Sequence, residues 1–344
     1  MTVGSSDTWS DVMVFVYLIR AEFYEYALCV GVIDMLPGIV IFLHHWNTET
    51  WSESSKLFRL FCLILIPLQP FSLFIVHVTW LMNIQSPHWH NLAKMSTTIH
   101  GSFETPCQTI MLLFLMGRGA LQLPWEENTI VTDRYNNQLP LGKIGTISLA
   151  ICVMSLLKAS VDSIEFDGIR PTLNALIFCV INLCFRIPAL AIAAIYLDMW
   201  FIIVLIVLLM VTGATFIYLK GNHDTTFFKA TTSIVFSVFL PICASRYPFE
   251  AQLIATKDAK RKNNTMNMEK DMKRKISCIV SLLTLPIIYF SNILVHVMVN
   301  QFDFNIDTNV VISNTQLEQI VFFYIIMYVG ITISNSILSP IFPG

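Results

Sequence analysis

The chain has 344 residues, of which 55% are hydrophobic and 13% are charged, and its formal net charge is −2. Soluble globular domains carry roughly 25% charged residues, so this composition excludes an ordinary soluble domain. The chain has no basic segment interleaved with aromatic residues, which is the pattern that would indicate a nucleic-acid partner. Repeated apolar runs of about 20 residues, the length that crosses a bilayer as a helix, predict an all-α, polytopic membrane helix bundle.

The first half of the chain contains five apolar runs that predict membrane-associated helices. They are Val12–Ile19, Phe23–Trp46, Leu57–Met82, His100–Met116 and Leu141–Val161. The first run is too short for a full span, and it lacks the basic leader and cleavage site of a signal peptide. We therefore expect a partial insertion, or a chain that lacks the upstream half of a longer first span.

The second half contains five further runs, which are Thr172–Met199, Trp200–Leu219, Phe227–Ala244, Ile276–Val299 and Ile320–Phe342. The second of these is the most apolar and is expected to face lipid. The pattern gives about ten membrane-associated segments, of which two or three are too short or too polar to cross fully. Because no internal repeat is visible, we expect a single transmembrane domain over residues 1–344.

The orientation is predicted from the largest polar segment, Lys257–Lys275, with the sequence KDAKRKNNTMNMEKDMKRK. Such a basic loop stays in the cytoplasm by the positive-inside rule, and the chain segments 51–59 and 118–143 then fall on the same side. We expect a multi-pass protein with both termini in the cytoplasm. The loop is interpreted as a topology determinant, although it could also touch anionic lipid headgroups.

Arg186 is the most informative position, because it lies in the middle of the apolar segment Pro171–Met199. A cation at the centre of a bilayer costs about 2.5–3.5 kcal/mol on insertion scales, so it requires a partner or a wet cavity. We expect Glu104 or Asp34 to be that partner. Two interpretations stay open: a static ion pair that holds helices together, or groups that line a hydrophilic groove.

The segment around Glu104 is the second polar feature, because Pro106 and Gln108 follow closely. Glu104 and Gln108 are four residues apart and therefore share one helix face. Pro106 frees backbone groups that lipid cannot satisfy, which favours a broken or re-entrant helix buried against protein. In the Leu141–Val161 region, Lys158 and Asp162 are also four apart, and a local ion pair is expected there.

No pattern in the chain indicates catalysis or metal binding. The eight cysteines lie in or beside apolar runs without C-x-x-C spacing, so we interpret them as small buried hydrophobic residues. The spacing of the eight histidines does not match a pattern of metal ligands. Phosphate-binding loops, nucleophile elbows and zinc-protease motifs are absent. We therefore expect no enzyme activity, no catalytic residue, no metal and no cofactor.

Three segments resemble, in order, segments of the XK-related membrane proteins, a family named for the partner of the Kell blood-group protein. They are SDVMVFVYLIRAEFYEYALCVGVIDMLPGIV at Ser10–Val40, FETPCQTIMLLFLM at Phe103–Met116 and CFRIPALAIAAIY at Cys184–Tyr196. The order and spacing of the segments fit over most of the chain. The chain departs from the family pattern at two positions. Pro106 comes one position earlier than the proline of the family, and Phe185 stands where the family usually has a serine before the arginine.

The resemblance implies about eight spanning helices plus two short re-entrant or partial helices. Some members of the family scramble phospholipids at the plasma membrane and expose phosphatidylserine in apoptosis. Others bind lipid-transfer proteins, and a single-span partner also occurs. By that resemblance, Asp11, Glu104 and Arg186 would belong to a series of charged side chains along which lipid headgroups cross the membrane while the tails stay in lipid. The partners that the resemblance implies are membrane phospholipids and a single-span or lipid-transfer protein, and no nucleic acid is expected.

Two alternatives of different classes remain. A seven-span chemosensory receptor has similar length and compact loops, and its odd number of crossings would place the two termini on opposite sides. A membrane adaptor for a lipid-transfer protein would need no scrambling activity of its own. Epitope tags at both ends of the chain separate the receptor from the scramblase.

Overall fold

We describe the fold from a computed structural model of the whole chain. It describes residues 2–46, 55–66, 99–118, 142–162, 186–195 and 200–220, together with single positions such as 120, 121, 131, 132, 138, 139, 238 and 284. The chain divides into two compact units, Met1–Ala159 and Ser160–Gly344, and each is described by itself.

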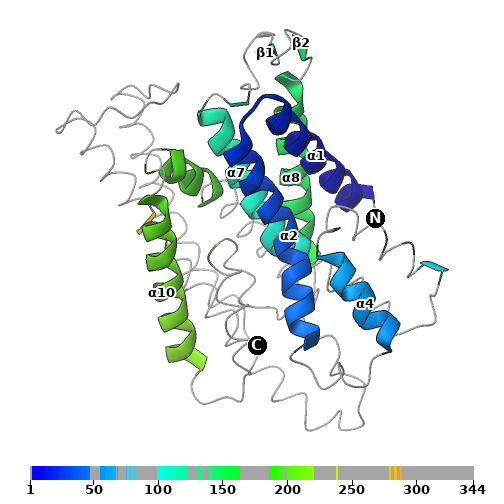
Figure 1. Cartoon of the computed structure of the whole chain (residues 1–344). Helices are drawn as coiled ribbons and strands as arrows, with labels where there is room; N and C mark the ends of the chain where they lie inside the picture. The colour runs from blue at the N-terminus through cyan, green and yellow to red at the C-terminus, as the bar shows by residue number, and fades with distance from the viewer. Residues whose placement is uncertain are drawn as a thin grey trace, which may run out of the picture. The chain divides into compact units, whose positions relative to one another are not determined.

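The described part of the first unit is almost entirely helical (Figure 1). In chain order its helices are α1 (Thr2–Arg20), α2 (Tyr24–Trp46), α4 (Lys56–Leu65), the π-helix η1 (His100–Glu104), α7 (Thr105–Gly117) and α8 (Gly142–Asp162). Two strands of two residues each, β1 (Val131–Thr132) and β2 (Gln138–Leu139), pair antiparallel between α7 and α8, with Val131 opposite Leu139. This small hairpin was not expected from the sequence.

The observed helices agree with several of the expected runs and correct others. Both α2 and α8 match their predicted ranges within one or two residues. Helix α1 is longer than the expected run of 12–19, because a helix that has nucleated extends through polar residues at little cost. Helix α4 ends at Leu65, two residues before Pro67, since a proline disfavours the helical conformation of the residue before it.

A tight turn at Glu22 connects α1 to α2. The amide of Phe23 donates to the carbonyl of Leu18 at 2.9 Å, and the amide of Glu22 donates to that of Ile19 at 3.2 Å. These two bonds form a Schellman motif, whose key residue adopts the left-handed conformation. Glu22 has φ 68° and occupies that place without being glycine, at a cost of order 1 kcal/mol or more. The turn sets α1 and α2 side by side as a helical hairpin.

The apolar core of the first unit is built by α1, α2, α7 and α8. It includes Val14, Leu18, Val30, Leu115 and Cys152, all of which are almost completely buried. Tyr17 also lies in this core, and its hydroxyl donates to the carbonyl of Ala120 across 3.4 Å. Helix α2 is the central element, since it packs against α1, α4, η1 and α7.

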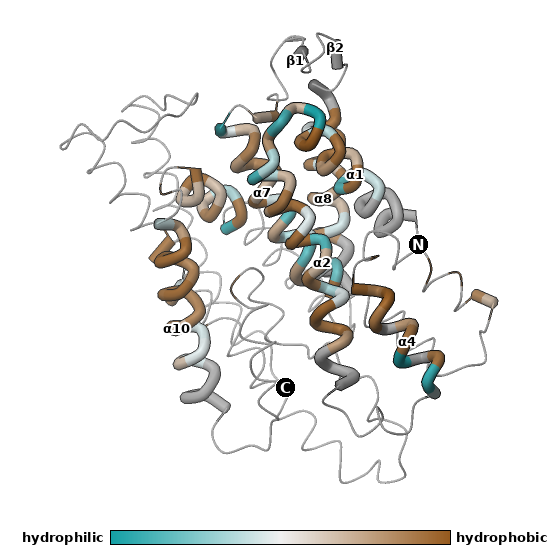
Figure 2. The backbone as a smooth tube through the Cα atoms, in the orientation of Figure 1, coloured by the Kyte–Doolittle hydropathy of each residue, from teal (hydrophilic) through white to brown (hydrophobic). Residues whose placement is uncertain are grey.

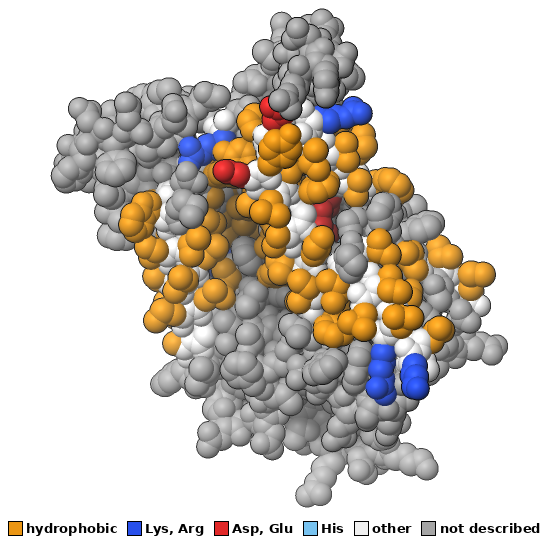
Figure 3. All heavy atoms as spheres, in the orientation of Figure 1, with side chains coloured by type: hydrophobic (Ala, Val, Ile, Leu, Met, Phe, Trp, Pro, Cys, Tyr) orange, Lys and Arg blue, Asp and Glu red, His pale blue; other side chains and the backbone are white. Residues whose placement is uncertain are grey.

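The exposed face of α2 is apolar, unlike the exposed face of a helix in a soluble protein. Its exposed face carries large apolar side chains, among them Leu28, which is 67% exposed, and Val32. Its buried face contains Asp34, which is 4% exposed. Helix α8 repeats this pattern, because Ile147 is exposed and Ser148 is buried. Figure 3 shows hydrophobic side chains over the visible faces of α1, α2 and α4.

In the second unit, the structure describes a short helix, Arg186–Ile195, and α10 (Phe201–Lys220). Most of α10 is hydrophobic along its length (Figure 2). Ile202, Ile206 and Met210 are exposed, whereas the polar residues Thr212 and Thr215 are buried. The expected apolar helix at 200–219 is therefore confirmed, and its exposed face is apolar like that of α2.

Among the described residues, one helical stretch, Tyr24–Phe42, is long and apolar enough to cross a membrane. Four shorter apolar helices accompany it, namely Thr105–Gly117, Ile144–Leu157, Arg186–Ile195 and Phe201–Thr215. Helical architecture is thus confirmed for the described part. The single transmembrane domain over 1–344 stays a prediction, and the basic loop Lys257–Lys275 and the last expected helix, Ile320–Phe342, lie outside the described residues.

Candidate functional site

The candidate site is built around the π-turn that precedes Pro106. A proline ring clashes with the carbonyl four residues earlier and donates no hydrogen bond, so a regular α-helix cannot pass through it undisturbed. The wider η1 turn accommodates it, and the Thr105 amide donates to the carbonyl of His100, five residues back. The Thr105 hydroxyl donates to the same carbonyl at 3.1 Å. The helix from His100 to Gly117 is therefore deformed but continuous, which corrects the expected break.

Three buried carboxylates from three different elements meet at this turn. Asp11 comes from α1, Asp34 from α2 and Glu104 from η1, and one carboxylate oxygen from each lies within 4.8 Å of the other two. All three side chains are at most 4% exposed. Residues separated by 93 positions in the sequence are thus gathered at one point inside the first unit. We refer to Asp11, Asp34 and Glu104 as the carboxylate cluster.

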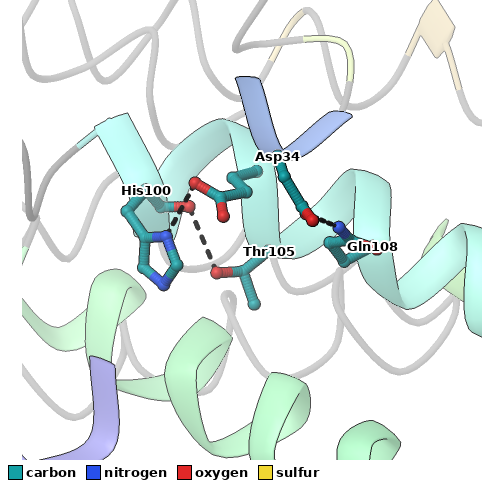
Figure 4. A network of polar contacts seen from close by, with 5 residues as sticks. Asp34, His100, Thr105 and Gln108 are labelled. Carbon is teal, nitrogen blue, oxygen red and sulfur yellow. Dashed lines mark hydrogen bonds and ion pairs between the residues drawn. The ribbon is translucent and has the colours of Figure 1, made fainter. Parts of the chain in front are cut away.

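Polar side chains on η1 and α7 contact two members of the carboxylate cluster (Figure 4). His100 Nδ1 and Glu104 Oε2 lie 2.8 Å apart, one helical turn from each other on η1. The amide of Gln108 donates to the carboxylate of Asp34 and so joins α7 to α2. His100 and Gln108 are themselves almost fully buried. The cluster is therefore part of a hydrogen-bonded polar network inside an apolar unit.

The carboxylate cluster must offset the repulsion between its own negative charges. Carboxylates that share a buried site cannot all be ionised without compensation, so a proton or an external positive charge lowers the energy. Oxygen ligands suit hard cations such as Ca²⁺ or Mg²⁺, and these three side chains could hold one such ion. They could equally receive an organic ammonium group, because the attraction depends on charge rather than on coordination geometry.

Arg186 lies in the second unit and is 0% exposed. Its Nε donates to the carbonyl of Val238 and its Nη1 donates to the hydroxyl of Thr284, both at 2.7 Å. The guanidinium therefore contacts positions 52 and 98 residues away in the sequence, and these hydrogen bonds offset part of its desolvation. An ion pair with Glu104 or Asp34 would join two units that are described separately, so it stays a prediction.

Four of the seven residues expected from the sequence come together in the first unit, namely Asp11, Asp34, Glu104 and Gln108. Lys158 and Asp162 both lie on α8, but their side chains are outside the described residues, so their pairing stays a prediction. Sequence reasoning missed His100. Its signal was available, because a histidine four residues before a glutamate on one helix places the two side chains on one face.

The cysteine prediction needs one correction. Of the eight cysteines, three are described with their side chains, and all three are free thiols. Cys152 is buried as expected and Cys107 is partly buried, but Cys29 is exposed on α2. A thiol is nearly as apolar as a small aliphatic side chain, so it can occupy an exposed apolar face as well as a core.

A scan of the chain against models of known protein families found no match, and a search of curated proteins found none either.

Proposed function

We propose that this chain is a polytopic membrane protein of the XK-related type that lets phospholipid headgroups cross a bilayer through its polar interior. In this proposal the lipid tails remain in the bilayer while the headgroups move past buried charged and polar side chains. No chemical bond changes and no nucleotide is consumed, so lipid moves down its own gradient. The observation that carries the proposal is the pairing of apolar exposed faces with a buried carboxylate cluster.

The exposed apolar faces support a lipid environment. A Leu or Met side chain that is left in water forgoes about 1.5–3 kcal/mol of burial free energy. Helices α1, α2, α4, α8 and α10 all expose several large apolar side chains. Contiguous exposed apolar patches mark membrane or protein interaction surfaces. At 1.5 Å per residue, the 23 residues of α2 extend about 34 Å, enough for a hydrocarbon layer of about 30 Å.

The buried polar groups support headgroup passage rather than packing alone. A phosphatidylcholine, phosphatidylethanolamine or phosphatidylserine headgroup carries an ammonium and a phosphate, so it needs both signs of charge along its route. Each unit contains one sign of charge in its interior: the carboxylate cluster lies in the first unit, and Arg186 lies in the second. Ionisable residues in membrane segments are expensive and usually belong to a transport route.

The test is leaflet exchange by purified protein in vesicles that contain a trace of fluorescent phospholipid. A membrane-impermeant reductant bleaches only the outer leaflet of protein-free vesicles, and we expect it to bleach both leaflets when the wild-type chain is present. Asp34→Asn should slow this exchange at least several-fold, because it removes one charge from the cluster. Met35→Ala, a change on the exposed face of the same helix, should leave the rate unchanged.

If the wild-type chain behaves like protein-free vesicles under every trigger, direct scrambling is excluded. A role as a membrane adaptor for a lipid-transfer protein would then be the remaining form of lipid handling.

A further inference from the structure

Helix α8 has a row of small side chains on its buried side. Ser148, Cys152 and Ser155 follow one another at intervals of four and three residues, and each is at most 6% exposed. Ile147 and Met154, on the other side of the helix, are more than half exposed. The buried side of α8 therefore presents hydroxyl and thiol groups to the interior of the first unit, while its exposed side is apolar.

This row lies next to the carboxylate cluster at one end. Ser148 Oγ donates to Ser10 Oγ across 3.1 Å, and Ser10 directly precedes Asp11 on α1. Ser155 follows Ser148 by seven residues, which is about 10 Å along the helix axis at 1.5 Å per residue. Ser155 is thus a buried polar residue of the same unit, displaced by two helical turns from the pair that joins α8 to α1.

The hydroxyl of Ser155 makes no contact that holds the fold together. A buried hydroxyl on a helix usually donates to the carbonyl of the preceding turn. Thr109 does so to Thr105 at 2.7 Å, and Thr215 does so to Val211 at 2.8 Å. Ser155 Oγ is buried as well, but among the residues that the structure describes it has no hydrogen-bond partner. Such a group lowers stability, and its hydrogen-bonding capacity is open to a ligand.

We propose that the Ser155 hydroxyl donates to a phosphodiester oxygen of a phospholipid headgroup that passes through the first unit. This inference, which rests on the proposed function, adds a residue that contacts the phosphate. The carboxylate cluster attracts the ammonium of a headgroup but repels its phosphate, so a phosphate contact has to lie away from the three acids. Ser155 meets that requirement because it lies two turns beyond the Ser148–Ser10 pair.

A serine is chemically suited to a contact that has to be transient. A hydrogen bond from a hydroxyl to an anionic oxygen is stronger than one between neutral groups. Because serine has no charge of its own, it forms no ion pair that would retain the phosphate. Conduction along a polar route requires binding that is favourable enough for entry and weak enough for release.

The experiment measures both lipid exchange and stability for Ser155→Ala in the full chain. Exchange is followed with fluorescent phosphatidylcholine in vesicles, and stability is the midpoint of unfolding by sodium dodecyl sulfate. We expect exchange to slow about tenfold, the factor that corresponds to loss of one hydrogen bond to a charged group. The unfolding midpoint should stay unchanged or rise, because the hydroxyl that is removed has no partner in the described fold.

Ser148→Ala is the matched control on the same face of α8. It makes the same chemical change, but it removes the hydrogen bond to Ser10, so its unfolding midpoint should fall. An equal fall in Ser155→Ala would mean that the Ser155 hydroxyl is structural. Exchange at the wild-type rate in Ser155→Ala would mean that it does not contact the lipid. Either result would overturn the inference.

Two further arms identify the ligand as a lipid phosphodiester. Ser155→Ala should leave the exchange of a fluorescent glucosylceramide, whose headgroup contains no phosphate, nearly unchanged. Added inorganic phosphate should leave the wild-type exchange of phosphatidylcholine unchanged. Equal slowing of both lipids by Ser155→Ala would contradict a phosphate contact. Inhibition by inorganic phosphate that is lost in Ser155→Ala would assign the hydroxyl to free phosphate instead.

Failure of the proposed function gives a different result from failure of this inference. A wild-type chain that exchanges no phosphatidylcholine contradicts the proposed function. A wild-type chain that exchanges it, together with a Ser155→Ala variant that does so at the same rate, contradicts only the role of Ser155.

Discussion

Among the described residues of the first unit, the buried carboxylates are costly to remove from water, so their neighbours decide whether the fold tolerates them. Asp34 accepts a hydrogen bond from Gln108, and Glu104 is paired with His100. Each such contact lowers the cost of removing a carboxylate from water. The polar network therefore has to be complete for the helices to pack, and its members should be sensitive to substitution even where no charge is changed.

Gln108→Leu tests this dependence at the scale of one residue. The change keeps the size of the side chain but removes the amide that donates to Asp34. Loss of one donor to a buried carboxylate should lower the free energy of unfolding by about 1–3 kcal/mol. The measurement is an unfolding titration with sodium dodecyl sulfate in mixed micelles.

Thr109→Val is the matched control for Gln108→Leu. Thr109 is the next residue on α7 and is equally buried, but its hydroxyl donates only to the helix carbonyl of Thr105, at 2.7 Å. Its loss deprives no carboxylate of a donor, so it should cost less than Gln108→Leu. Equal effects of the two variants would mean that Asp34 does not depend on Gln108.

At this scale the sequence predicted which residues are unusual but not which of them meet. Asp34 and Glu104 were identified because an acid inside an apolar run is costly wherever it lies. Asp11 was placed in the site only through the family resemblance, because it lies before its apolar run and its burial depends on the tertiary packing of α1. The π-turn at η1 could not be predicted, since Pro106 is compatible with a break, a kink or a wider turn.

The hairpin of α1 and α2 shows how an element-level contact depends on a small residue. Gly31 lies where α2 approaches α1, and a Cβ added there would lie 3.1 Å from Cε2 of Phe15. That distance is shorter than ordinary van der Waals contact, so the Phe15 ring would have to move. Small residues at helix contacts allow this kind of close approach in membrane bundles.

Gly31→Leu should therefore separate the two helices and lower the free energy of unfolding by about 1–3 kcal/mol through overpacking. Val32→Leu adds volume one residue later, on the exposed face, and should change it by less than about 0.5 kcal/mol. Both are measured by the same detergent titration. A tolerated Gly31→Leu would contradict the packing of α1 against α2 described here.

Element boundaries were predictable where an apolar run had clear polar ends. Helices α2 and α8 are examples, since charged or turn residues flank both runs. Boundaries were predicted wrongly where the residues of a segment are compatible with more than one secondary structure. The polar first residues of α1 join a helix that the apolar run alone did not include. The hairpin of β1 and β2 lies in a segment that we had treated only as a cytoplasmic loop.

At the scale of the whole molecule, composition predicted the helical class, whereas the distribution of polarity needed the structure. The sequence could not tell which face of α2 is exposed, because its apolar residues surround the helix. The structure places Leu28 outside and Asp34 inside. Whether Arg186 pairs with an acid depends on the arrangement of the two units, so periodicity and spacing along the chain do not decide it.

The central claim is that the exposed apolar faces are covered by lipid, and the natural thiol of Cys29 tests it most directly. Cys29 is exposed on α2, and a cysteine placed by Ser55→Cys lies at the polar end of α4. Both are treated with a membrane-impermeant maleimide on both sides of reconstituted vesicles, and labelled peptides are identified by mass spectrometry. The account predicts that Cys29 stays unmodified until the protein is denatured, while Ser55→Cys reacts at once. Rapid modification of Cys29 in intact vesicles would mean that water covers this face, and it would contradict the account.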